Sequence, residues 1–219
     1  MSENEKTERS RILSPLERIS EILFGLIMAL TFTGALSAAT AGHEEVRTMI
    51  FGAIGCNLAW GLVDGVMYLL NALTERGLAI RTFERLRRTR DPAEGQAIIA
   101  DTLPPVVASF LSPAELESMR QKIVRLPPPP RPRLRPPDYL GALVVMVIVF
   151  LSTFPLVIPF LVVGETLRAM RLSNAIALVM LAILGYRLGR YGGYQPILTA
   201  LSMVGIGVSL VLITMALGG

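Results

Sequence analysis

One carboxylate in the middle of an apolar segment constrains this chain more than any other feature. Residues 48–73 contain a single charged side chain, Asp64, and the segment is long enough to cross a bilayer, which needs about 20 residues. A charge at that depth costs at least about 2.5–3.5 kcal/mol, and such acids usually face the interior of a helix bundle or an ion pathway. Asn57, Asp64 and Asn71 are spaced by seven residues, so on a helix they form one stripe. We expect the function to lie along this stripe.

Composition places the chain among helical membrane proteins. It has 219 residues, of which 52% are hydrophobic and only 17% charged, and its mean hydropathy is +0.55. Soluble domains of this size are less apolar and carry more charge. Five long apolar runs account for the excess. We therefore predict an all-α, polytopic membrane protein with five transmembrane helices.

The apolar runs and the polar segments between them predict four regions. These are a cytoplasmic N-terminal tail (1–18), transmembrane helices 1 and 2 (19–73), a cytoplasmic helical insert with a Pro/Arg-rich connector (74–137), and transmembrane helices 3 to 5 (138–219). Within them, the expected spans cover 19–40, 48–73, 138–164, 172–188 and 196–217, with polar turns at 43–47, 164–171 and 189–193.

Local motifs predict where several helices begin, bend or continue. Ser or Asp followed by Pro and, two residues later, Glu is a helix start, and it occurs at residues 14–17, 91–94 and 112–115. The second membrane helix has no proline before residue 88, so we expect it to project beyond the membrane. Residues 126–137 hold seven prolines and three arginines, which favours an extended spacer; an SH3- or WW-type ligand is the alternative.

The distribution of Lys and Arg predicts the topology. The tail, the insert and the turn between helices 4 and 5 contain eighteen, whereas the opposite side contains three. Basic residues accumulate on the cytoplasmic side. The N-terminus is therefore expected inside and the C-terminus outside, in an integral membrane protein of the type found in a bacterial inner membrane.

Several residues are candidates for handling a metal ion. A carboxylate, an amide and thioethers together suit a first-row divalent cation, so Asp64, Asn57 and two methionines at comparable depth, Met28 and Met67, form the predicted metal site. The alternative for the asparagines is structural hydrogen bonding, and for the methionines core packing. Lower-ranking candidates are Asn71 and Glu75 along the pathway, Pro155 and Pro159 for gating by a kink in helix 3, Glu115 and Met119 as a weak site on the insert, and His43 and Glu165 in loops.

Other function classes lack their motifs. The sequence contains no nucleophile elbow, HExxH pattern or P-loop, and its one histidine lies in a predicted loop, so an enzyme is not expected. Topology explains the arginines without a nucleic-acid partner. Cys56 is the only cysteine, which excludes a disulfide framework. We expect no permanently bound cofactor.

The closing third of the chain carries a family resemblance. The segments LSTFP (151–155), RLSNA (171–175) and LGYRLGR (184–190), together with five helices and an insert after the second, resemble the vacuolar iron transporter family. The resemblance implies a homodimer that exports Fe²⁺ or Mn²⁺ from the cytosol by proton exchange along a path between the protomers.

Two departures from the family pattern limit what the resemblance implies. Family members usually carry an Asp-Gly pair on the first helix, whereas here GLIMA (25–29) has no acid and GLVDG (61–65) stands on the second helix. The family's insert is often rich in Glu and Met, whereas residues 74–137 have twelve Lys/Arg against seven acids, a balance that repels cations. The competing hypothesis is a non-transporting membrane protein whose basic insert binds a partner or anionic lipid.

Overall fold

The computed structural model describes residues 13–37 and 43–218, and over these residues the chain is helical and contains no strand. The helices are α2 (Pro15–Ser37), α3 (His43–Arg88), α4 (Pro92–Thr102), α5 (Pro105–Phe110), α6 (Pro113–Val124), α7 (Pro136–Leu151), α8 (Phe154–Val162), α9 (Thr166–Gly192) and α10 (Pro196–Gly218).

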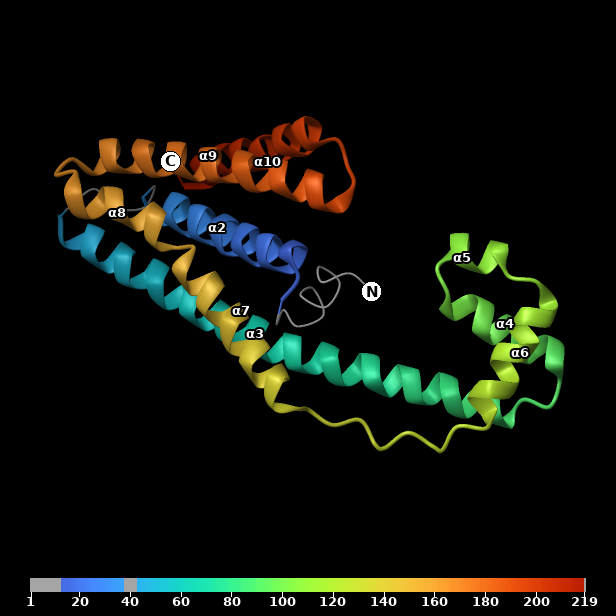
Figure 1. Cartoon of the computed structure of the whole chain (residues 1–219). Coiled ribbons are helices and arrows are strands. Elements are labelled where there is room, and N and C mark those ends of the chain that lie inside the picture. Colours follow the sequence, from blue (N-terminus) through green and yellow to red (C-terminus); the bar gives the residue numbers. More distant parts are fainter. Residues whose placement is uncertain (1–12, 38–42, 219) are drawn as a thin grey trace, which may run out of the picture. The chain divides into compact units, whose positions relative to one another are not determined.

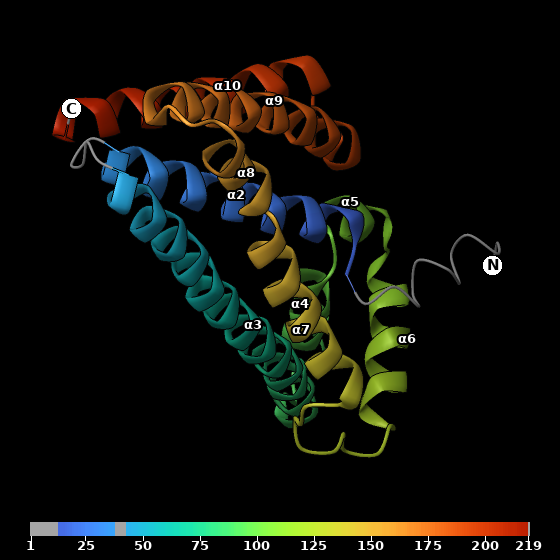
Figure 2. The ribbon, with the colours of Figure 1, turned by 90° about the vertical axis from the view of Figure 1, so that its left-hand side faces the viewer.

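The chain divides into two compact units. Unit 1 comprises Met1–Tyr68 and Pro136–Gly219, and unit 2 comprises Leu69–Arg135. In unit 1, α2 lies between the α9–α10 hairpin and α7 (Figures 1 and 2) and contacts all three helices as well as α8. The core of this unit is apolar and centred on α2, and its most buried members are Leu26, Ala29, Leu30, Leu156, Ala177 and Leu181.

Unit 2 has a small core of its own. Leu86 from the end of α3 packs with Ile98 and Ile99 of α4, and Leu116 and Met119 of α6 cover them. Because this cluster is much smaller than the core of unit 1, polar contacts at the helix ends contribute a larger share of the stability of unit 2.

Four helical segments are long and apolar enough to cross a membrane: Ile50–Arg88, Pro136–Val162, Thr166–Gly192 and Pro196–Thr214. They correspond to the second to fifth predicted spans. These four lie within the described residues, and α2, which holds the first predicted span, is not among them. The protein is thus all-helical with several apolar spans, and the count of five stays a prediction.

Helix α3 is continuous over 46 residues. At 1.5 Å per residue it is about 69 Å long, more than twice the roughly 30 Å of a bilayer core, so a spanning α3 extends beyond the membrane. The predicted turn at 43–47 is wrong, because α3 begins at His43. Glutamates favour the first turn of a helix because its N-terminus carries a partial positive charge.

The predicted third membrane helix is broken rather than kinked. It consists of α7 and α8, separated at Ser152 and Thr153. Pro155 lies in the first turn of α8, where its missing N–H is harmless, and Pro159 is accommodated inside α8. The α-helical ladder ends before Pro155 because proline cannot donate to the carbonyl four residues earlier.

Helix α9 is longer than predicted at both ends. The turns expected at 164–171 and 189–193 shrink to a few residues, because α9 runs over 27 residues and stops at Gly193, whose φ of +75° forms a left-handed cap. Arg168, Arg171, Arg187 and Arg190 therefore belong to the helix. Long arginine side chains can lie on a membrane helix near its ends while keeping their charge in water.

The three predicted helix starts are confirmed. Glu17 N donates to Ser14 Oγ at 3.2 Å, and Ala93 N donates to Asp91 Oδ1 at 3.0 Å. Ser112 and Glu115 form a reciprocal capping box. These starts depend on residues within one turn of each other, which is why the sequence predicts them well.

Candidate functional site

A buried amide joins three elements of unit 1. Asn57 of α3 is 1% exposed, and its Nδ2 donates to the Gly25 carbonyl oxygen of α2 at 3.1 Å and to Thr153 Oγ1 at 2.6 Å. Thr153 lies in the break between α7 and α8 and is fully buried. Asn57 Oδ1 is buried and has no partner, so one acceptor at this junction remains open to a donor or a cation.

Asp64 lies two turns farther along the same face of α3. Its side chain is half-buried, and its Oδ2 atom is buried without a hydrogen-bond partner. Seven residues correspond to about 10.5 Å along a helix, so Asn57 and Asp64 cannot bind one ion together. They would act at successive positions on a path.

A second carboxylate accompanies Asp64. Glu21 of α2 is half-buried and interacts electrostatically with Asp64. The positions of Glu21 and Asp64 follow the antiparallel register of the two helices, in which Phe24 and Trp60 pack edge to face with ring centroids 5.9 Å apart. Neither carboxylate forms a hydrogen bond or an ion pair with any residue that the structure describes. No motif in the sequence indicates Glu21 as a site residue. It is identified by the antiparallel register of α2 and α3.

The position of Asp64 is set by a close crossing of α3 and α7. A Cβ atom on Gly61 would lie 2.8 Å from the Met146 carbonyl oxygen, and one on Gly65 would lie 2.9 Å from that of Ala142. Two small residues four apart allow two membrane helices to approach at backbone distance. Asp64 lies directly beside this crossing, so a change in the packing of α7 acts on the carboxylate.

The other predicted ligands are spread along the helices. Met28 is half-buried on α2. Met67 is 48% exposed, one turn from Asp64. Asn71 and Glu75, both exposed, follow on the part of α3 that belongs to unit 2. The structure therefore brings Asp64 together with Glu21 rather than with a compact set of methionines.

The weak candidates on the insert serve the structure of unit 2. The Glu115 carboxylate accepts hydrogen bonds from Ser112 N at 2.8 Å and from Ser112 Oγ at 2.7 Å, and the backbone bond in particular holds the pKa of Glu115 below its ordinary value. Met119 packs on the core of unit 2. Across residues 13–37 and 43–218, no three His, Cys, Asp or Glu side chains gather where they could hold a metal ion.

The tightest polar cluster in unit 2 was not predicted. Arg120 donates to both carboxylate oxygens of Glu117, at 2.8 and 2.7 Å, and Gln121 and Gln96 donate to the same carboxylate. These bonds, that of Arg120 first, lower the pKa of Glu117 to about 2. The cluster joins α6 to α4 beside the Leu86–Ile98 core, so its role is structural.

Comparison with known proteins finds one family. A family model described as "VIT family" matches residues 84–219, more than half of the chain. The match covers α4 to α10 and leaves out Glu21, Asn57 and Asp64. No curated protein matches the chain.

Proposed function

The chain belongs to the VIT family, a family of membrane metal-ion transporters and not of enzymes, and we propose that it exports a divalent cation, Fe²⁺ or Mn²⁺, from the cytosol in exchange for protons. The observation that carries this proposal is the pair Asp64 and Glu21. The two half-buried carboxylates, one on α3 and one on α2, interact electrostatically, and neither has a hydrogen-bond partner among the described residues.

The pair can alternate between two neutralised states. Two like charges held close together cannot both stay ionised at low cost. A divalent cation neutralises both carboxylates, and protons do the same when the cation leaves. Because metal binding requires deprotonated ligands, it releases protons, and this competition gives a physical basis for exchange.

Other groups extend the pair into a path. Asn57 Oδ1, the open acceptor two turns away, offers a second oxygen ligand, and Met28 a softer one. The break between α7 and α8, with Pro155 at the start of α8, is the proposed hinge for alternating exposure. Because Asn57 donates a hydrogen bond to Thr153 in this break, a movement of the hinge would shift the Asn57 side chain on the path.

Orientation and assembly are part of the proposal. The excess of Lys and Arg in the tail, the insert and the α9–α10 turn supports an N-terminus inside and a C-terminus outside, in a bacterial inner membrane. A homodimer is supported by the apolar face that α3 leaves exposed, with Leu58, Leu62, Val66 and Leu70 each between 48% and 59% exposed.

Metal flux tests the proposal. Wild type, Asp64→Asn and Glu21→Gln are reconstituted in proteoliposomes, and Fe²⁺ or Mn²⁺ flux is measured with a pH gradient. Either substitution should lower flux about tenfold or more, because even supporting partners of a metal site are worth 10- to 100-fold. Glu84→Gln, which removes an exposed acid from the part of α3 outside the proposed path, should leave flux unchanged. Equal flux in wild type and Asp64→Asn rejects the proposal.

A basic cavity in unit 2 supports the competing function. Its volume is about 440 Å³. It is lined by Arg81, Glu84, Arg85, Arg88, Thr89, Arg90 and Glu94. A non-transporting protein that binds a partner or anionic lipid through this cluster would lose its activity on deletion of residues 91–125 and keep it in Asp64→Asn, the opposite of the pattern expected for transport along the carboxylate pair.

A further inference from the structure

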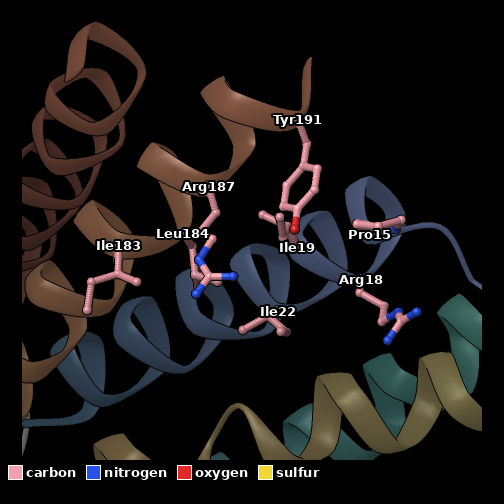
Figure 3. Close-up of a pocket in the computed structure, with 8 residues that line it drawn as sticks. All are labelled: Pro15, Arg18, Ile19, Ile22, Ile183, Leu184, Arg187 and Tyr191. Atoms are coloured by element: carbon pink, nitrogen blue, oxygen red, sulfur yellow. The ribbon is translucent and has the colours of Figure 1, made fainter. Parts of the chain in front are cut away.

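A cavity at one end of unit 1 has the chemistry of a phospholipid site. It is about 530 Å³ in volume, within the range of about 300–1,000 Å³ that is usual for small-molecule sites. It lies between the start of α2 and the end of α9 (Figure 3), and it is lined by Pro15, Arg18, Ile19, Ile22, Ile183, Leu184, Arg187 and Tyr191.

The cavity combines an apolar wall with two fixed positive charges. Ile19 and Ile22 of α2 and Ile183 and Leu184 of α9 supply the apolar wall. The Arg187 side chain and the Tyr191 hydroxyl reach toward α2, whereas the Arg18 guanidinium points away from both (Figure 3). On each helix the lining residues recur at intervals of three or four positions, apart from the adjacent pairs Arg18–Ile19 and Ile183–Leu184, so they share one face.

No acid neutralises these charges within the cavity. None of the eight lining residues is Asp or Glu. The glutamate nearest to Arg18 along α2, Glu17, accepts a hydrogen bond from Ser14 N at 2.6 Å, and Glu21 is not among the residues that line the cavity. Arg187 makes no hydrogen bond or ion pair with a described residue. Arg18 donates hydrogen bonds from Nε and Nη2 to the Leu13 carbonyl oxygen.

We propose that this cavity binds one anionic phospholipid, whose phosphate is held by Arg187 and Tyr191, with Arg18 adding positive charge at the same end of unit 1, and whose acyl chain lies along the isoleucines. Arginine matches the geometry of phosphate, and basic pockets between membrane helices are typical sites for anionic headgroups. Both arginines belong to segments for which the Lys/Arg distribution predicts the cytoplasmic side, where anionic lipid is available. The site is separate from the carboxylate pair and does not depend on the transported ion.

A lipid bound in this cavity would hold two helices of unit 1 together. A lipid in this cavity joins the start of α2 to the end of α9, and α2 carries Glu21 one turn after Arg18. Bound lipid should therefore stabilise unit 1 against unfolding, because a ligand that binds only the folded state shifts the equilibrium toward it.

Lipid titration of the full-length chain in detergent tests the site. Dioleoylphosphatidylglycerol and dioleoylphosphatidylcholine are titrated separately, and adducts are counted by native mass spectrometry while the melting temperature is followed. Phosphatidylglycerol should bind about tenfold more tightly and raise the melting temperature, and Arg187→Gln should weaken its binding about tenfold, the scale of one charge-assisted hydrogen bond. The matched control Arg168→Gln removes the same charge from the other end of α9, where Arg168 pairs with Glu165, and should bind as wild type does.

Several results would overturn the proposal. These are equal binding of the two lipids by wild type, wild-type binding by Arg187→Gln, and an equal loss in Arg168→Gln. A shift of the melting temperature by glycerol 3-phosphate at the same concentrations would identify a soluble phosphate ester as the ligand instead of a lipid. If Arg187→Gln does not fold, Tyr191→Phe tests the site instead. Loss of its one hydroxyl donor should weaken phosphatidylglycerol binding about threefold. Unchanged binding by Tyr191→Phe rejects the site.

Discussion

Asn57 of α3 donates a 2.6 Å hydrogen bond to Thr153, the residue at which the α7–α8 segment breaks. The bond ties the helix that carries Asp64 to the discontinuity produced by Pro155. Both side chains are almost completely buried. The junction is therefore both a packing element and a link between the proposed path and its hinge.

Asn57→Ala should destabilise unit 1. The substitution leaves the buried Thr153 hydroxyl without its donor and removes the side-chain bond to the Gly25 carbonyl oxygen, which keeps its bond within α2. An unsatisfied buried group costs about 1–3 kcal/mol. The measurement is the unfolding free energy in mixed detergent micelles. Asn71→Ala, on the same helix but exposed, is the control and should change stability by less than about 0.5 kcal/mol. A similar loss in both variants would show that the junction has no special role.

Gly61→Ala and Gly65→Ala should each force α3 away from α7. The new methyl groups would lie 2.8 and 2.9 Å from backbone carbonyl oxygens, and overpacking of this kind costs about 1–3 kcal/mol. Thermal unfolding in detergent measures the effect. Gly55→Ala is the matched control, since a Cβ there meets nothing within 4 Å, and it should be neutral or slightly stabilising because alanine favours helices. Wild-type stability of Gly61→Ala would contradict the close crossing.

The Glu117 cluster should make unit 2 sensitive to acid. Hydrogen bonds from Arg120 first, then from Gln121 and Gln96, lower the pKa of Glu117 from about 4.5 to about 2. A carboxyl group with a lowered pKa in the folded state contributes stability above its unfolded pKa, and that contribution disappears as pH falls from about 4.5 toward 2. The carboxyl ¹³C chemical shift of Glu117, followed over this range, measures the titration directly.

Glu117→Gln is the corresponding variant. It should be less stable than wild type at pH 7 and should lose part of the pH dependence of unfolding between about 4.5 and 2. Glu75→Gln, which changes an exposed acid of the same unit, serves as the control and should keep that pH dependence. A titration midpoint of Glu117 near 4.5 would show that the cluster does not hold in solution.

Ser112→Ala should unravel the start of α6. Loss of the N-cap hydroxyl costs about 1 kcal/mol, and it also removes one of the hydrogen bonds that Glu115 accepts. Amide hydrogen exchange should accelerate in the first turn of α6. Ser118→Ala, an exposed position in the middle of the same helix, should leave that turn as protected as in wild type. Unchanged exchange in Ser112→Ala would mean that packing on Met119 alone holds the helix end.

The elements that the sequence predicts well are those set by neighbouring residues. The starts at Ser14, Asp91 and Ser112 are confirmed because a cap, a proline and a glutamate within one turn determine them. The ends of α9 are mispredicted for the converse reason. Arg171 and Arg187 look like the limits of an apolar run, yet their side chains can reach water from within a longer helix, and the backbone stops only at Gly193.

Hydropathy, helix caps and motif segments are local properties, and they are therefore enough to predict a helical chain that is apolar enough to span a membrane and resembles a transporter family. The sequence also identified Asp64, since a carboxylate in an apolar run is costly wherever the helix packs. The partners of these side chains depend on the packing of whole helices. Glu21 interacts electrostatically with Asp64, and Asn57 bonds Thr153, because an antiparallel register of α2 with α3 and a crossing of α3 with α7 bring together residues 43 and 96 positions apart. Such partners depend on how whole helices pack, and no spacing within one helix encodes them.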